Sequence, residues 1–279
     1  MNTSKQLTDL IKNLAKKTGV NAQTLQKRYF MERFLERISH SDYNKRFIIK
    51  GGILISAMVG LDMRSTMDID VTVKNMPLER SSLEAVVKNI MTVDTGDNFV
   101  FTFDKMENIH DESEYDCFRA HLNVAFDKMR EKIKIDITTG DIITPKEVQF
   151  GYDAIMGGKR IALYSYNLET VFAEKIETIL SRGTTNTRMR DYYDCYVLER
   201  LYSSEISADT FKAALKATSN RRGSDFIFAD YETIKAELKS SKTLKSLWKN
   251  YQGKFSYAEN ITFLDAIEAI ERLMREFYK

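Results

Sequence analysis

Two stretches of the chain alternate apolar and charged residues with a period of two, and this pattern predicts strands. The first is Met67-Asp68-Ile69-Asp70-Val71, and the apolar run 47–49 predicts another strand before it. The second is 132–137, where isoleucines occupy one face and Lys134 and Asp136 the other. Further strands are expected at 99–106, 120–126 and 161–166, the last at a sheet edge, with a solvated acidic hairpin loop at 111–116.

Apolar residues at helical spacing fill most of the remaining chain. Helices are expected at 7–14, 25–38, 53–60, 81–91, 168–180, from about 189, and at 209–217, 231–238, 244–251 and 260–277. Thr24 and Asn167 are the expected N-caps of two of them, because short polar side chains accept hydrogen bonds from the first backbone amides of a helix. Gly223 and Gly253 are expected to mark breaks. The strands together with these helices predict an α+β fold that is rich in helix.

Composition places the chain among ordinary folded proteins. Of its 279 residues, 29% are charged and 43% hydrophobic, and only two are proline, which favours helix. No run of about 18 apolar residues occurs, so we expect neither a signal peptide nor a membrane span. Two cysteines, Cys117 and Cys195, are too few for a disulfide framework and fit a reducing cytoplasm. The histidines are isolated, so any metal is expected to be a hard cation bound by oxygen.

The net charge of +2 does not mark the whole chain as a nucleic-acid-binding protein, but two segments are locally basic. Residues 235–254 carry six lysines against Glu237 alone, with Trp248 and Tyr251 among them. The N-terminal helices contain Lys16, Lys17, Lys27, Arg28, Arg33 and Arg37. Such segments can bind RNA phosphates and stack aromatic rings on bases, or they can be solvated helix faces with buried aromatic residues.

The segment around 67–71 carries the central candidate chemistry. Asp68 and Asp70 share one strand face, about 7 Å apart along the strand, and can converge on one or two divalent cations. Gly51 and Gly52 precede a helix, where backbone amides can contact a phosphate. Together these features suggest metal-assisted chemistry on a nucleoside triphosphate.

Three nearby residues each allow two interpretations. Asp136 can join the aspartate pair if its strand neighbours theirs, or it can face solvent or cap the strand end. Ser65 and Thr66 can donate hydrogen bonds to phosphate, or they can shape the turn into the strand.

The helices after residue 167 supply further candidates. Lys175 offers a compact positive charge to a β- or γ-phosphate, or it forms a surface ion pair with a neighbour such as Glu174 or Glu177. The next helix contains Arg190, Asp191 and Asp194. Asp191 points about 100° away from Arg190, so one of the two aspartates can reach the site while the other pairs with the arginine.

Four motifs follow one another in the chain: Lys50-Gly51-Gly52, the segment from Arg64 to Asp70, Ala173-Glu174-Lys175, and Arg190-Asp191-Tyr192-Tyr193-Asp194. Together they resemble the AbiE-type (AbiEii) toxin nucleotidyltransferases of bacterial abortive-infection systems. The resemblance covers roughly residues 45–200. Each motif is common by itself, whereas the ordered set is specific.

This resemblance implies a polymerase β-like nucleotidyltransferase lobe at 1–166, made of a small mixed sheet with helices, and a helical lobe at 167–279 that completes the cleft. It implies a cytoplasmic toxin of a phage-defence system, paired with an antitoxin encoded nearby. The implied reaction transfers a nucleotide from an NTP, with GTP or CTP as candidates, to RNA, with the 3′ end of tRNA as the expected acceptor. Mg²⁺ or Mn²⁺ is the expected cofactor.

The motifs also imply roles for individual residues. The expected catalytic residues are Asp68, Asp70, Lys175 and Asp191; the expected nucleotide-binding residues are Gly51, Gly52, Ser65, Thr66, Lys175 and Arg190; and the expected metal ligands are Asp68, Asp70 and Asp136. The superfamily signature has Gly-Ser before its D-x-D, whereas this chain has Arg64-Ser65. The backbone around the phosphate is therefore expected to differ from that of the superfamily.

Two other functions fit the same residues. One is nucleotide transfer to a protein or to a small molecule such as an aminoglycoside. The other is a GTP-binding toxin that acts by binding a partner, without chemistry. Incubation with labelled NTPs separates them, because transfer leaves label on the acceptor and binding alone leaves none.

Overall fold

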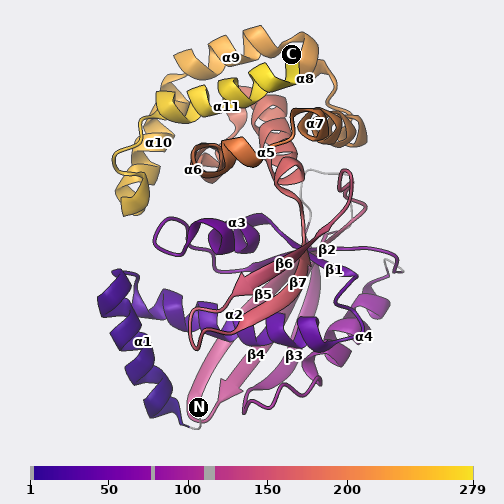
Figure 1. The fold of residues 1–279 in the computed structure, drawn as a ribbon, viewed down its shortest axis with the longest axis vertical. Helices are drawn as coiled ribbons and strands as arrows, with labels where there is room; N and C mark the ends of the chain where they lie inside the picture. The colour runs from indigo at the N-terminus through magenta and orange to yellow at the C-terminus, as the bar shows by residue number, and fades with distance from the viewer. Residues whose placement is uncertain (1–2, 77–78, 110–116, 279) are drawn as a thin grey trace. The chain divides into compact units, whose positions relative to one another are not determined.

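The computed structural model describes residues 3–76, 79–109 and 117–278, which form two compact units (Figure 1). The first unit contains Met1–Gly140 and Val148–Ser165, and the second contains Asp141–Glu147 and Tyr166–Lys279. In the described residues the strands all belong to the first unit, and the second is helical. The α+β class predicted from the sequence is confirmed.

The first unit is built on one mixed sheet. Its strands are β1 (Phe47–Lys50), β2 (Ile69–Val73), β3 (Val100–Ile109), β4 (Cys117–Phe126), β5 (Met129–Thr139), β6 (Val148–Asp153) and β7 (Arg160–Ser165). They lie in the order β3-β4-β5-β2-β1-β7-β6. The pairs β2/β5 and β1/β7 are parallel, and the other neighbours are antiparallel. Because β5 lies next to β2, the condition under which Asp136 could join the aspartate pair is met.

Helices cover one face of this sheet. The unit contains α1 (Ser4–Thr18), α2 (Ala22–His40), α3 (Gly51–Val59) and α4 (Arg80–Met91). Helices α2 and α4 contact each other, and they pack on β5 and on β3 and β4, respectively. In β5 the three isoleucines of 132–137 are at most 1% exposed, while the residues between them keep contact with solvent. Burial of such side chains contributes about 2 kcal/mol each, which fixes the face that β5 turns to the core.

Three arginines of α2 that were expected at a basic surface are buried instead. Arg28 and Arg33 lie near Glu32 and Glu36 of the same helix, at 3.5 and 2.6 Å. Arg37 forms a bidentate pair with Asp97, with its nitrogens 2.6 and 3.0 Å from the two carboxylate oxygens. The expectation fails for these three because the sequence shows the charge of a side chain but not the partner that allows its burial.

The second unit is a bundle of helices. They are α5 (Leu168–Arg182), α6 (Met189–Tyr202), α7 (Ala208–Arg222), α8 (Phe226–Ala229), α9 (Tyr231–Ser240), α10 (Lys242–Lys254) and α11 (Phe263–Tyr278), with short 3₁₀ turns at Gly183–Thr185, Ser203–Glu205 and Ser256–Ala258. Helix α5 packs on α6 and α7, and α11 packs on α6 and α7. The predicted N-cap of α5 is confirmed, since Asn167 Oδ1 accepts a hydrogen bond from the Thr170 amide at 2.8 Å.

The lysine-rich helix α10 uses its aromatic residues for packing. Trp248 is 2% exposed, and its Nε1 donates a hydrogen bond to the Ile261 carbonyl at 2.8 Å. Tyr251 is also buried. Of the two interpretations of this segment, the structure supports the solvated helix with buried aromatic residues.

Some local predictions are wrong. The N-cap of α2 is Asn21 rather than Thr24, because the helix extends one polar turn before its first buried residue. The strand at 161–166 is not at an edge, because β6, whose weak alternation hid it, pairs with β7. Gly253 lies inside α10, which continues to Lys254. The acidic loop at 111–116 falls outside the described residues.

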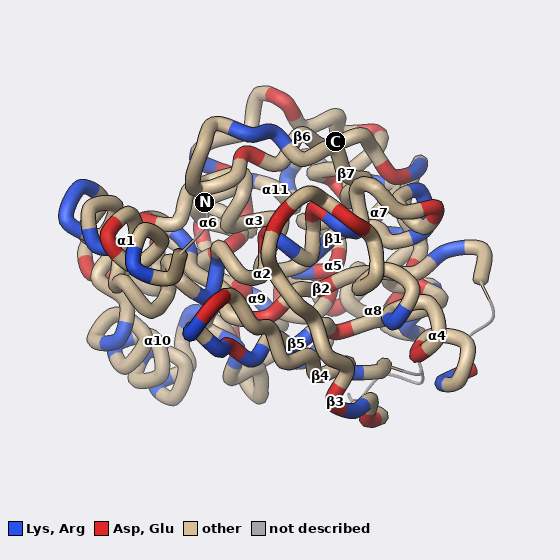
Figure 2. Tube along the Cα trace, turned by 90° about the horizontal axis from the view of Figure 1, so that it is seen from below, with Lys and Arg blue, Asp and Glu red and all other residues tan. Residues whose placement is uncertain are grey.

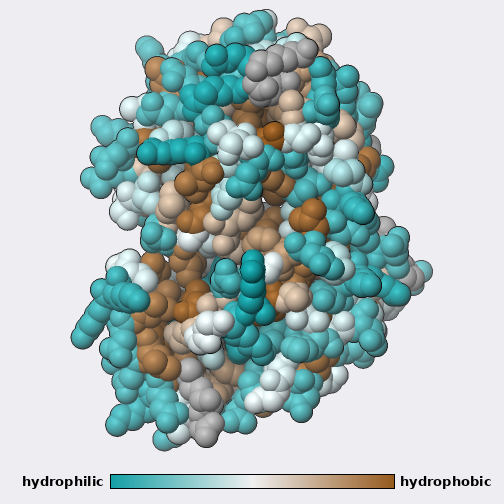
Figure 3. Space-filling model, in the orientation of Figure 1, coloured by the Kyte–Doolittle hydropathy of each residue, from teal (hydrophilic) through white to brown (hydrophobic). Residues whose placement is uncertain are grey.

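Charge is distributed over both units. Figure 2 shows basic and acidic segments interspersed along the chain, and hydrophilic residues make up most of the surface visible in Figure 3. Among the described residues, no helix is both long and apolar enough to cross a membrane.

Candidate functional site

Two of the three predicted metal ligands lie side by side in the sheet. Asp70 of β2 is in register with Asp136 of β5, so both side chains point to the same face. Asp68 comes just before β2, which begins at Ile69. All three aspartates are partly exposed. Asp68, Asp70 and Asp136 therefore all lie near the start of β2 in the first unit.

The glycine pair lies directly against Asp70. Gly51 and Gly52 begin α3, and the Gly52 amide donates a hydrogen bond to Asp70 Oδ2 at 2.9 Å. A Cβ atom on Gly51 would lie 2.6 Å from the same oxygen. A Cβ atom on Gly52 would lie 2.8 Å from Thr66 Oγ1. Only glycines allow β2 and the turn before it to approach the helix start this closely, and the amide expected to contact phosphate here bonds the aspartate.

The turn before β2 is held by buried polar side chains. Arg64 is 2% exposed, and its guanidinium donates a hydrogen bond to the Ser65 carbonyl. Thr66 is 5% exposed, and its hydroxyl donates to the Asp68 carbonyl at 3.4 Å. These contacts favour the turn-shaping interpretation of Thr66. Phosphate binding by Ser65, which is partly exposed, stays a prediction.

Replacing Gly51 with alanine is expected to destabilise the protein by about 2–5 kcal/mol. Gly51 has φ +55°, a left-handed conformation that costs a residue with a Cβ atom about 1–2 kcal/mol. The clash with Asp70 adds about 1–3 kcal/mol or displaces that carboxylate. Urea unfolding measures the loss.

Gly19→Ala is the matched control for this substitution. Gly19 has φ +74°, and a Cβ atom there would meet nothing within 4 Å. It therefore carries the conformational cost alone. Equal destabilisation by the two substitutions would show that the clash of a Cβ atom at Gly51 with Asp70 contributes nothing to the loss in free energy of unfolding.

Arg119 of β4 is a site residue that the sequence reasoning missed. It lies opposite Asp136, and its Nε and terminal nitrogen donate hydrogen bonds to the two carboxylate oxygens at 2.7 and 2.8 Å. The pKa of Arg119 is raised above its ordinary value, first by this hydrogen bonding and then by the charges of Asp136, Asp68 and Glu107. The prediction began the strand at residue 120 and so left Arg119 out. In the sequence, apolar residues alternate with other residues back to Phe118, and this alternation could have shown that the strand includes Arg119.

Asp68 and Asp70 suit the predicted divalent cation better than Asp136 does. Mg²⁺ is usually held by one or two carboxylates together with substrate phosphates and water, which the exposed pair can provide. Both oxygens of Asp136 are already engaged by Arg119. In the part of the chain that the structure describes, no three His, Cys, Asp or Glu side chains are grouped closely enough to hold a metal. The metal-binding roles stay predictions.

In the second unit, Lys175 of α5 lies between two aspartates of α6. Its Nζ donates a hydrogen bond to Asp191 Oδ1 and lies 3.1 Å from Asp194 Oδ2. Asp194 is fully buried, and the side chains of Asp191 and Lys175 are 9% and 18% exposed. Because Asp191 and Asp194 are three residues apart on one helix, both reach the lysine.

The other expected partners of Lys175 and of the aspartates have different roles. Glu174 and Glu177 contact Arg222 of α7, at 3.2 and 2.5 Å, and the partners that the structure gives Lys175 are Asp191 and Asp194. Arg190 is exposed, and its guanidinium carbon lies 5.5 Å from the centre of the Phe255 ring. The nucleotide-binding role of Arg190 stays a prediction.

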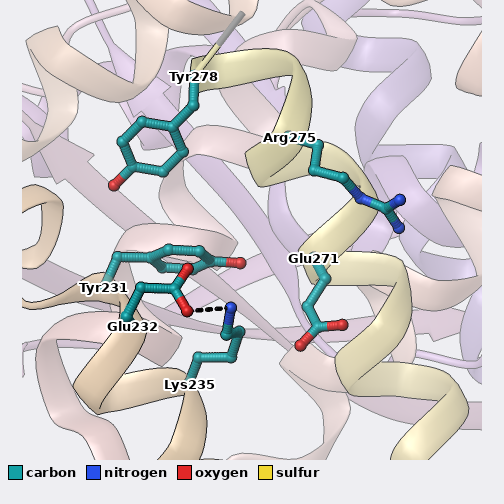
Figure 4. A pocket seen from close by; sticks show the side chains of 6 residues that line it. All are labelled: Tyr231, Glu232, Lys235, Glu271, Arg275 and Tyr278. Carbon is teal, nitrogen blue, oxygen red and sulfur yellow. Dashed lines mark ion pairs between the residues drawn. The ribbon is translucent and has the colours of Figure 1, made fainter.

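A separate cavity of about 460 Å³ lies between α9 and α11 (Figure 4). Tyr231, Glu232 and Lys235 line it from α9, and Glu271, Arg275 and Tyr278 line it from α11. Glu232 pairs with Lys235 at 2.5 Å, and Glu271 pairs with Lys239 at 2.5 Å. Its charges are thus largely balanced, and none of the predicted site residues lines it.

Comparisons with known proteins agree with the fold of the chain. The chain is similar in fold to two crystal structures from Helicobacter pylori, each with a TM-score of 0.51. One, JHP933, is 14% identical, and the match covers 93% of this chain and 95% of that one. The other, described as a "putative nucleotidyltransferase", is 18% identical over 93% and 98% of the two chains.

A family description also matches the sequence. Residues 33–272 match the family described as nucleotidyl transferase AbiEii toxin, type IV TA system. Among curated proteins, none matches the chain.

Proposed function

The chain belongs to the AbiEii family of nucleotidyltransferase toxins of type IV toxin–antitoxin systems, and we propose that it transfers a nucleotide from an NTP to RNA, with tRNA as the acceptor. Membership of this family makes the protein a toxin and a nucleotidyltransferase, and it also implies an antitoxin partner and an NTP substrate. The RNA acceptor, the divalent metal and action in the cytoplasm are part of the proposal.

The observation that supports the proposal most strongly is the contact between Asp70 and the start of α3. The Gly52 amide holds one Asp70 oxygen at 2.9 Å, and Asp68 lies two residues away, just before the strand begins. A carboxylate held in this way is oriented before any ligand binds. Fixed geometry of this kind lowers the reorganisation that phosphoryl-transfer chemistry requires.

The proposed reaction is an in-line displacement at phosphorus. A hydroxyl oxygen of the RNA attacks the α-phosphorus of the NTP, the bond from that phosphorus to the bridging oxygen breaks, and pyrophosphate leaves. Asp68 and Asp70 would hold Mg²⁺, which when bound neutralises phosphate charge and lowers the pKa of a coordinated hydroxyl. Either aspartate can accept the proton that the hydroxyl loses.

Lys175 is proposed to bind the β- or γ-phosphate, with Asp191 orienting it. A lysine held by two carboxylates has its ammonium group fixed in place. The exposed Arg190 is proposed to add charge for the triphosphate.

Incubation of the protein with NTPs labelled at the α-phosphate tests the proposal. With Mg²⁺ and total tRNA, label is expected to move to RNA, and a chelator is expected to abolish the transfer. Parallel reactions with protein fractions and with an aminoglycoside examine the other acceptors. Label on protein or on the small molecule, but not on RNA, would contradict the RNA acceptor. Tight NTP binding without any product would favour a toxin that acts by binding alone.

A further inference from the structure

We infer that the open face of β3, β4 and β5 binds the phosphate backbone of the acceptor RNA, next to the aspartates at the start of β2. This inference rests on the proposed function and adds to it the surface that receives the substrate. We call this surface the basic sheet face, and define it by Lys105, Arg119, His121, Arg130, Lys132 and Lys134.

Strand register places these side chains together. Lys105 faces His121, which faces Lys134, and Asn123 faces Lys132 one step further along the strands. Facing residues on neighbouring strands project to the same side of a sheet. On β4 and β5, the side chains of the opposite side are buried, whereas the side chains on this side are partly or fully exposed. The basic sheet face is therefore accessible in the first unit.

Positive charge exceeds negative charge on this face. The acidic residues that the register assigns to this face are Glu107 and Asp136, and Asp104 is exposed beside Lys105 at the register shift of β3. Glu107 contacts Lys105 and His121, at 2.6 and 2.7 Å, and Asp136 is held by both Arg119 nitrogens. The lysines of β5 thus add positive charge that these two carboxylates do not neutralise. A surplus of cations in a row suits a polyanion rather than a single phosphate.

The basic sheet face is continuous with the proposed reaction centre. One row of register runs from Asp70 to Asp136, then to Arg119, then to Glu107. Strands are about 4.8 Å apart, so Arg119 lies roughly 10 Å from Asp70 across the sheet. An RNA whose terminal hydroxyl reaches the aspartates would therefore lay its preceding phosphates over this face.

Two other charged surfaces lack these features. The aromatic residues of α10 are buried, so its lysines have no exposed ring beside them for stacking on a base. The cavity between α9 and α11 is lined by two acidic and two basic side chains, of which Glu232 and Lys235 pair with each other and Glu271 pairs with Lys239. The basic sheet face alone combines surplus charge with direct register to Asp70 among the surfaces that the structure describes.

RNA binding by a charge-reversed variant tests the inference. Lys132→Glu/Lys134→Glu removes two cations from the face, and Lys245→Glu/Lys249→Glu changes the net charge equally on exposed positions of α10. Binding of total tRNA is measured at several salt concentrations without NTP. The sheet variant is expected to bind tRNA at least about tenfold more weakly. The slope of the logarithm of its binding constant against the logarithm of salt concentration is expected to be shallower by about two, one for each lost lysine. The α10 variant is expected to bind as wild type does.

Further readouts exclude loss of fold as the cause. Lys132→Gln/Lys134→Gln should show a smaller effect in the same direction, and both sheet variants should keep the wild-type melting temperature and NTP affinity. In the transfer assay, the sheet variants should raise KM for RNA and leave kcat nearly unchanged.

The outcomes separate this inference from the proposed function. If wild-type protein labels RNA and the sheet variant binds RNA equally well, the assignment of this face is wrong and the function stands. If the α10 variant loses binding instead, the RNA lies on α10. If wild-type protein neither binds nor labels RNA, both the proposed function and the assignment of RNA binding to this face are wrong.

Discussion

Replacing Asp70 with asparagine is expected to slow nucleotide transfer by at least about 1000-fold, or roughly 4 kcal/mol in activation free energy, while the protein stays folded. The asparagine oxygen can still accept the Gly52 hydrogen bond, which is 2.9 Å long in the wild-type protein. The substitution therefore removes the charge and preserves the contact. A neutral amide binds a divalent cation much less well than a carboxylate does.

The measurement is the initial rate of label transfer from NTP to tRNA over a range of Mg²⁺ concentrations. Asp153→Asn is the matched control, since its side chain is 83% exposed at the end of β6 and pairs only loosely with Arg160 at 3.6 Å. This variant should retain full activity. An Asp70→Asn protein that kept more than a tenth of the wild-type rate would exclude Asp70 as a metal ligand.

Replacing Lys175 with methionine is expected to lower the free energy of unfolding by about 3–5 kcal/mol. Methionine fills much of the same space but leaves Asp191 and Asp194 without their shared cation, in a place where Asp194 is fully buried. An uncompensated buried charge is more costly than a lost surface contact. Chemical denaturation measures this loss, and the transfer assay is expected to show little activity.

A second substitution separates the structural role of Lys175 from its proposed role in binding phosphate. Asp194→Asn is expected to destabilise the wild-type protein but to restore stability to the Lys175→Met variant, because it removes the buried negative charge that has lost the lysine. Activity is expected to stay low in the double variant, since no ammonium group remains for the triphosphate. Recovery of transfer together with stability would mean that Lys175 acts only through the fold.

Much of the fold could be predicted because it depends on local patterns. The isoleucines of 132–137 alternate with polar residues, and burial of one face follows from that alternation. Asn167 could be recognised as a cap because capping involves only neighbours in the chain. Strand β6 could not be recognised, since only one of its side chains, Tyr152, is fully buried and the rest resemble a loop.

The candidate site divides in the same way. The carboxylates Asp68 and Asp70 and the lysine Lys175 stand in motifs that the sequence displays directly. Arg119 stands in none of these motifs, and the motif that ends at Asp194 does not show its contact, because each contact depends on a partner on another element: Asp136 on the neighbouring strand β5, and Lys175 on α5.

The sequence by itself determined the class of fold, the family and the aspartate pair at the start of β2, because periodicity and ordered motifs are properties of neighbouring residues. Only the tertiary structure decided which charges are satisfied. It buried three arginines of α2 beside acidic partners, engaged Asp136 with Arg119, and bonded the Gly52 amide to Asp70. The physical reason is that the cost of burying or exposing a charge depends on partners brought together by folding, and the linear order of residues does not contain those distances.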